Sequence, residues 1–128
     1  MSFTNTTETL ALTWLFTASA ATRPTAWHVA LFTAAPGETG GGTELSTVGT
    51  AYARQAATFT VSGNLATNSG AIEYPTATAS WGTITHIAVF DAATGGNMLA
   101  YATLTASKTI ASGDVFRIPA GDLDITLE

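Results

Sequence analysis

A ten-residue phrase occurs twice in the chain and limits what the chain can fold into. His28 to Gly37 read HVALFTAAPG, and 58 positions later His86 to Gly95 read HIAVFDAATG, with six of the ten positions identical. Each copy is an apolar run that ends in Ala-Ala and a glycine-bearing turn, which is typical of a β-strand leading into a turn. In each copy the histidine shares a strand face with the residues at i+2 and i+4. We therefore interpret the phrase as one structural unit used twice, either in two facing sheets or next to each other in one sheet.

The chain after Pro24 alternates short strand patterns with glycine-containing turns. The pattern predicts strands over 26–33, 52–61, 65–74, 83–91, 98–106 and 115–118. The segments 83–91 and 98–106 flank a Gly-Gly loop and form a predicted hairpin. The last strand has the clearest period of two, because Leu123, Ile125 and Leu127 face one way and polar residues face the other. These patterns predict a mainly β fold, an antiparallel β-sandwich of jelly-roll or Greek-key type with one short N-terminal α-helix.

The N-terminal segment predicts that helix, at about residues 5–18. Asn5 and Glu8 have the spacing of a capping box, in which two side chains satisfy free backbone N–H groups. Leu10, Trp14 and Leu15 then fall on one helix face. Because so short a helix is marginal alone, this face is expected to dock on its own sandwich or on a neighbouring subunit. No linker divides the remaining sequence, so residues 1–128 are expected to form one domain.

The low charge content is the most unusual compositional feature. Charged residues make up 10% of the chain, against about 25% in an ordinary soluble domain. The net charge of −5 and the four scattered basic residues argue against nucleic-acid and anionic-membrane partners. A sparsely charged surface limits solubility, so we expect copies of the chain or another protein to cover part of it. The alternative is a threonine-rich β surface that is soluble without help.

Residues that could carry chemistry are few. The chain has no cysteine, no nucleophile elbow, no P-loop and no dinucleotide fingerprint. His28 and His86 could hold a metal only with a further ligand such as Asp91 or Glu73, and they lack the spacing of a recognised zinc site. We therefore predict a protein that is not an enzyme, with no catalytic residue, metal or cofactor.

Loop contacts are the remaining possibility for a binding site. The candidates are Gly40, Gly41 and Gly42, whose backbone freedom disfavours a regular element, and Trp81. Trp81 lies between two turn-like segments and is the tryptophan best placed for exposure, although packing is the commoner fate of tryptophan and is favoured here. An exposed indole beside the glycine loop would suit a carbohydrate-binding module, because indole faces stack on sugars.

Three segments resemble a known family when they are taken in order. They are ALFTAAPGETGGGTEL (30–45), YARQAATFTVSG (52–63) and TATASWGTITHIAVFDAATGGNML (76–99). They are similar to small structural proteins of tailed-bacteriophage virions, often labelled tail-fibre-like, over nearly the whole chain. The resemblance implies a virion structural protein and carries over no catalytic residue.

The resemblance leaves two placements in the virion open. A capsid decoration (cement) protein would be a compact homotrimer on the capsid surface, bound to the major capsid protein and stabilising the shell. A tail-fibre or tail-tip component would present loops to a host receptor. A fibre usually needs an elongated shaft, and neither shaft repeats nor coiled-coil heptads occur in this sequence. The sequence therefore favours capsid decoration, with the tail-fibre component second and a carbohydrate-binding module third.

Overall fold

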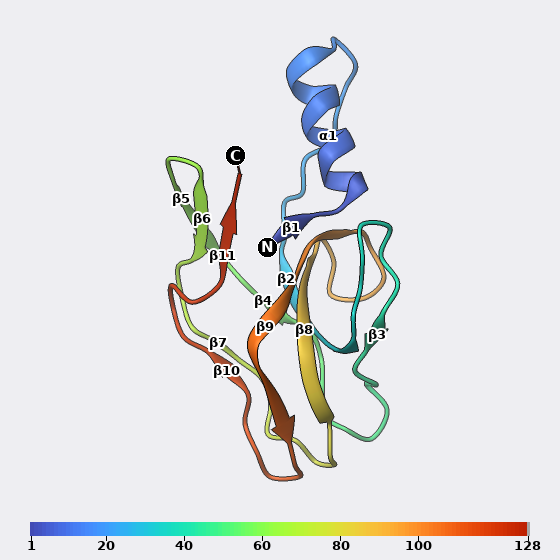
Figure 1. Ribbon diagram of the computed structural model, residues 1–128, viewed down its shortest axis with the longest axis vertical. Helices are drawn as coiled ribbons and strands as arrows, with labels where there is room; N and C mark the ends of the chain where they lie inside the picture. The colour runs from blue at the N-terminus through green and yellow to red at the C-terminus, as the bar shows by residue number, and fades with distance from the viewer. Residues whose placement is uncertain (128) are drawn as a thin grey trace.

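The chain folds into antiparallel β-sheets with one N-terminal helix, which projects from one end of the molecule (Figure 1). The computed structural model describes residues 1–127. The elements in chain order are β1 (Ser2–Phe3), α1 (Asn5–Phe16), β2 (His28–Ala34), β3 (Thr43–Glu44), β4 (Gln55–Ala56), β5 (Phe59–Ser62), β6 (Leu65–Asn68), β7 (Ile72–Glu73), β8 (Gly82–Phe90), β9 (Met98–Ile110), β10 (Arg117–Ile118) and β11 (Asp124–Thr126). The largest sheet has six strands in the order β1-β9-β8-β2-β3, with β4 also paired to β2.

The two copies of the repeated phrase form neighbouring strands of this sheet. β2 pairs with β8 in antiparallel register, with Val29 opposite Val89 and Ala30 opposite Ala88. Ala88 is also the residue that corresponds to Ala30 in the second copy, so an approximate two-fold axis passes between these two alanines. The copies therefore lie next to each other in one sheet, which is one of the two arrangements that the sequence predicted.

Both faces of β2 are buried, with different partners. Val29 and Leu31 belong to the main core, whereas Ala30 and Phe32 face a second cluster on the other side of the sheet. The second cluster also contains Ala88, Phe90 and Met98. The predicted division of this strand into two faces is confirmed. The main core consists of Val29, Leu31, Leu45, Tyr52, Ala57, Ile72, Tyr74, Ala77, Trp81, Ile84, Ile87, Val89, Ile110, Phe116, Ile118 and Leu123.

Two smaller antiparallel sheets, β10-β7 and β11-β6-β5, complete the sandwich. Ile72 of β7 and Ile118 of β10 pack in the main core together with Leu123, which precedes β11. Asn68 at the end of β6 is buried, and its side chain donates to the carbonyl of Pro119 and accepts from the N–H of Leu123. The predicted fold class, an antiparallel β-sandwich with one N-terminal helix, is confirmed.

Several predicted strand boundaries are wrong. The strand expected over 52–61 is divided between two sheets, because β4 pairs with β2 and β5 pairs with β6. The strand expected over 65–74 is likewise divided into β6 and β7. The hairpin expected from 83–91 and 98–106 is confirmed as β8 and β9, with β9 extending to Ile110. The helix expected at about 5–18 is confirmed as α1, which ends at Phe16.

Candidate interaction surfaces

The start of α1 is held tightly against the main sheet. Thr4, which precedes the helix and is only 2% exposed, donates from its hydroxyl to the carbonyl of Met98 at 2.6 Å. Thr7, in the first turn, donates to the carbonyl of Leu99 at 2.7 Å. The predicted capping box of Asn5 and Glu8 is wrong, because Thr4 is the N-cap residue and no side chain caps the helix. The hydroxyl that would cap the helix bonds to β9 instead, so it fixes the direction in which α1 leaves the sheet.

The second half of α1 is uncharged, and its large apolar side chains are mostly exposed. No residue of the helix is buried, and residues 9–22 contain no charged side chain. Of the three residues predicted to dock, Leu10 is half-buried in the middle of the helix, whereas Trp14 and Leu15 are 71% and 61% exposed. Leu12 and Phe16 are 59% and 77% exposed. The exposed apolar side chains of α1 therefore do not pack against the sandwich of their own chain.

An apolar groove lies at the foot of α1, between the helix, β9 and the β11-β6-β5 sheet. The foot groove has a volume of about 370 Å³. Thr7 is the one polar residue that lines it, and Val61 at its edge is 75% exposed. Trp27 and Phe59 form an edge-to-face pair in its wall, with ring centroids 6.5 Å apart. The full lining is Phe3, Thr7, Leu10, Pro24, Trp27, Phe59, Val61, Ala66, Val89, Leu99, Ala100 and Ile125.

The glycine loop forms a compact, exposed turn. Gly37 and Gly40 exchange two backbone hydrogen bonds of 2.8 and 2.9 Å, which close a tight turn. Gly40, Gly41 and Gly42 all have positive φ, of 91°, 76° and 74°. At Gly42 a Cβ atom would lie 2.6 Å from the backbone nitrogen of Pro36, so only glycine fits there. The loop thus has a defined structure, and its glycines allow the positive φ angles that its backbone adopts.

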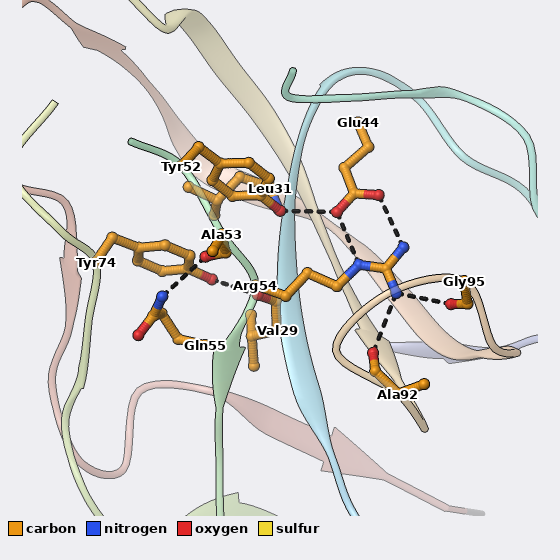
Figure 2. A network of polar contacts seen from close by, with 10 residues as sticks. All are labelled: Val29, Leu31, Glu44, Tyr52, Ala53, Arg54, Gln55, Tyr74, Ala92 and Gly95. Carbon is orange, nitrogen blue, oxygen red and sulfur yellow. Dashed lines mark hydrogen bonds and ion pairs between the residues drawn. The ribbon is translucent and has the colours of Figure 1, made fainter. Parts of the chain in front are cut away.

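Beside this loop lies a largely buried polar network that no sequence pattern predicts (Figure 2). Arg54 donates from Nε and Nη2 to the two carboxylate oxygens of Glu44, each at 2.8 Å. Its Nη1 donates to the carbonyls of Ala92 and Gly95, and its guanidinium carbon lies 3.6 Å from the ring centroid of Phe90. The hydrogen bonds to Glu44 raise the pKa of Arg54 above its usual value. The network joins β3, the segment before β4 and the β8–β9 turn.

Tyr52 completes this network. Its hydroxyl accepts from the N–H of Leu31 at 3.0 Å and donates to Glu44 at 2.9 Å. Burial raises the pKa of Tyr52 well above its usual value, so the hydroxyl remains a donor. Every polar group described in the network has a partner, which is typical of a structural network. Glu44, Tyr52 and Arg54 are ten residues or fewer apart, but neither periodicity nor a motif marks them as partners.

Trp81 is buried, so it cannot contribute to an exposed loop contact. It is 3% exposed, and its indole nitrogen donates to the carbonyl of Thr50 at 2.8 Å. Its ring packs edge-on against Tyr52 and Tyr74. It belongs to the main core, where its apolar ring has aromatic neighbours and its N–H has a carbonyl acceptor. The carbohydrate-binding hypothesis loses its only proposed stacking residue.

The two histidines do not form one site. In the β2–β8 register His28 lies opposite Phe90 and His86 lies opposite Phe32, at opposite ends of the paired segment. Asp91, proposed as a third ligand, accepts two hydrogen bonds from Asn97 and closes the β8–β9 turn. Within residues 1–127 no three His, Asp or Glu side chains are grouped as metal ligands. The same residues contain no helix that is long and apolar enough to cross a membrane.

Comparison with known proteins agrees with the resemblance noted in the sequence. No curated protein matches the chain. The model of one family, described as "Podophage GP4 fiber I protein gp80", matches residues 2–126. The match spans both copies of the repeated phrase, α1 and all three sheets. The chain therefore belongs to this family of phage fibre structural proteins.

Proposed function

We propose that this protein is a fibre component of a phage tail that assembles with copies of itself through α1. The exposed apolar surface of the helix is the observation that carries the proposal. Burying a large apolar side chain contributes about 1.5–3 kcal/mol, and Leu12, Trp14, Leu15 and Phe16 all remain more than half exposed. An apolar helix surface is normally buried against another element, so an isolated copy leaves this surface of α1 without a partner.

The proposed role is structural. The family description supports a fibre, and the polar network around Arg54 has its groups paired within the chain, which suits rigidity. The proposed partners are copies of the chain, in the homotrimer expected from the sequence, and other virion proteins. The fibre placement comes first here because it is the one that the family description supports.

Capsid decoration, with the major capsid protein as partner, is the second candidate. The compact body of packed sheets supports it, since such a body covers a capsomer junction without an extended shaft (Figure 1). Both candidates require the chain to associate with other subunits, and both can use α1. They differ in where the subunits lie on the virion.

Sedimentation velocity over a range of concentrations tests the assembly. The wild-type chain is expected to sediment as an oligomer, and the double variant Trp14→Ser, Phe16→Ser as a monomer with unchanged circular dichroism. Val48→Ser is the matched control, because Val48 is 84% exposed but lies in the loop between β3 and β4. A monomeric wild-type chain at all concentrations would contradict the proposal.

Cryo-electron microscopy of the virion tests the placement. Density for this sandwich along the tail is expected if the chain is a fibre component. Density over the capsid lattice would contradict the fibre placement and support capsid decoration.

A further inference from the structure

We propose that the tip of α1, formed by Trp14, Leu15 and Phe16, docks into the foot groove of a second copy of the chain. This inference rests on the proposed function, in which α1 is the assembly element, and adds the surface that receives it. One copy of the chain has both an exposed apolar tip and an apolar hollow of about 370 Å³ that the tip does not fill. A hollow of this size is within the range of about 300–1,000 Å³ in which proteins bind apolar groups.

The tip cannot fill the groove of its own chain. Thr4 and Thr7 hold the start of α1 on β9 by hydrogen bonds to the carbonyls of Met98 and Leu99. Leu10 lines the groove, and the helix then continues away from the sheets (Figure 1). The tip lies four to six residues beyond Leu10, about 6–9 Å further along the helix axis, and none of its three residues lines the groove of its own chain.

The arrangement of apolar side chains on the tip favours a groove over a flat partner. At 3.6 residues per turn, Trp14 lies about 160° around the helix from Phe16. Both rings are more than 70% exposed. A flat surface covers only one side of the helix and leaves one of these rings in water. A groove encloses both sides, so it suits a tip whose apolar side chains spread over more than half of the helix circumference.

The absence of charge on both surfaces indicates that the tip binds an uncharged protein surface. None of the residues that line the foot groove is charged, and neither is any residue from 9 to 22. Helices that bind membrane surfaces carry Lys or Arg on a polar face, and α1 has neither, while Glu8 and the net charge of −5 disfavour anionic lipid. Another copy of the chain supplies an uncharged groove for an uncharged tip.

The tip contributes a substantial apolar area to such a contact. Aromatic side chains bury about 150–250 Å² each, so the two rings of the tip alone bury about 300 Å². In a closed assembly each copy gives one tip and receives one, so it buries its own tip and its own groove. The two rings of the tip thus supply part of the roughly 800 Å² that each partner buries in a typical specific interface.

Disulfide trapping tests the contact, and the chain suits it because it has no cysteine. Leu15→Cys and Val61→Cys are prepared separately, mixed and oxidised, so that any 15–61 disulfide joins two chains. Both side chains are exposed, at 61% and 75%, so neither substitution removes a core group. We expect the mixed species to exceed both homodimers, with the 15–61 peptide identified by mass spectrometry. The control pairs Leu15→Cys with Ser112→Cys, in the exposed turn after β9, at the end of the sheet remote from α1 (Figure 1).

The possible outcomes separate this inference from the proposed function. A 15–61 link above the control supports the contact. A dominant 15–15 link, or no link above the control while the unoxidised mixture still sediments as an oligomer, overturns the groove contact and leaves assembly through α1. A mixture that stays monomeric overturns both. Binding of a monomeric chain to phosphatidylcholine vesicles, lost in Trp14→Ser, would replace the second copy by lipid.

Discussion

Replacing Arg54 by methionine should destabilise the fold much more than a typical surface substitution. The Arg54 side chain is 8% exposed and that of Glu44 is 27% exposed, with two charge-assisted hydrogen bonds of 2.8 Å between them. Removing one partner of a buried ion pair costs about 3–5 kcal/mol. Water still reaches part of the Glu44 carboxylate, so the lower end applies, and we expect a loss of about 3 kcal/mol in the free energy of unfolding.

Two further losses act in the same direction. Methionine cannot donate to the carbonyls of Ala92 and Gly95, which the guanidinium now holds at 3.1 and 2.8 Å. The contact of the cation with the ring of Phe90 is also lost, which is worth about 0.5–2 kcal/mol. The β8–β9 turn should therefore exchange its amide hydrogens faster in the variant, in addition to the global loss of stability.

Urea unfolding followed by fluorescence and circular dichroism measures the loss. Urea is chosen because guanidinium chloride is a salt and screens the ion pair. The matched control is Arg117→Met, because Arg117 pairs with Glu73 at 3.8 Å with side chains 53% and 64% exposed. An exposed pair contributes about 0–1 kcal/mol. If the two substitutions have the same effect, or if Arg54→Met costs less than about 1 kcal/mol, the buried network does not stabilise the fold as argued.

The other predictions concern single positions. Gly42→Ala should cost clearly more stability than Gly41→Ala in urea unfolding, because both residues have positive φ but only at Gly42 would a Cβ meet the backbone of Pro36; equal losses would refute the steric argument. Asn68→Leu should cost about 2–4 kcal/mol, because the buried amide makes three hydrogen bonds whose backbone partners would be left unpaired; a loss below about 1 kcal/mol would contradict this. Burial acts to raise the pKa of Asp91, but the hydrogen bonds from Asn97 outweigh it and lower the pKa, so the stability it contributes is present above the usual aspartate pKa and is lost as the pH falls through the lowered value. Asp91→Asn should flatten the acid limb of the stability-pH curve, and an unchanged limb would refute this assignment.

The sequence predicted best the part of the fold that is determined by local pattern. β2 and β8 each carry a continuous apolar run because both faces of these central strands are buried, and the repeat made their equivalence visible. The sequence did not predict that these strands pair with each other about Ala30 and Ala88, and this pairing is seen only in the structure. The β8–β9 hairpin was also predictable, since a glycine turn separates two strands that pair with each other.

The parts that the sequence did not reveal depend on long-range contacts. The run 52–61 alternates as one strand, but the chain crosses between sheets where Ala57 donates to the carbonyl of Trp27. No glycine or proline marks that crossing. The predicted capping box is absent because Thr4, and not Asn5, is the N-cap residue, and the hydroxyl of Thr4 bonds to a carbonyl 94 residues away in β9. The buried position of Trp81 likewise depends on the carbonyl of Thr50, which lies 31 residues earlier.

Most of the few charged residues of the chain lie in the sheets and turns of the sandwich. Glu44 and Arg54 form the buried pair, Glu73 and Arg117 form an exposed pair between β7 and β10, and Asp91 closes a turn. These charges serve the body of the sandwich, whereas α1 beyond Glu8 and the foot groove carry none. If the composition only reflected a threonine-rich surface, the neutral regions would not need to be complementary in shape. Here one is a projecting apolar tip and the other an apolar hollow, and the proposed contact between copies would cover both of these uncharged regions.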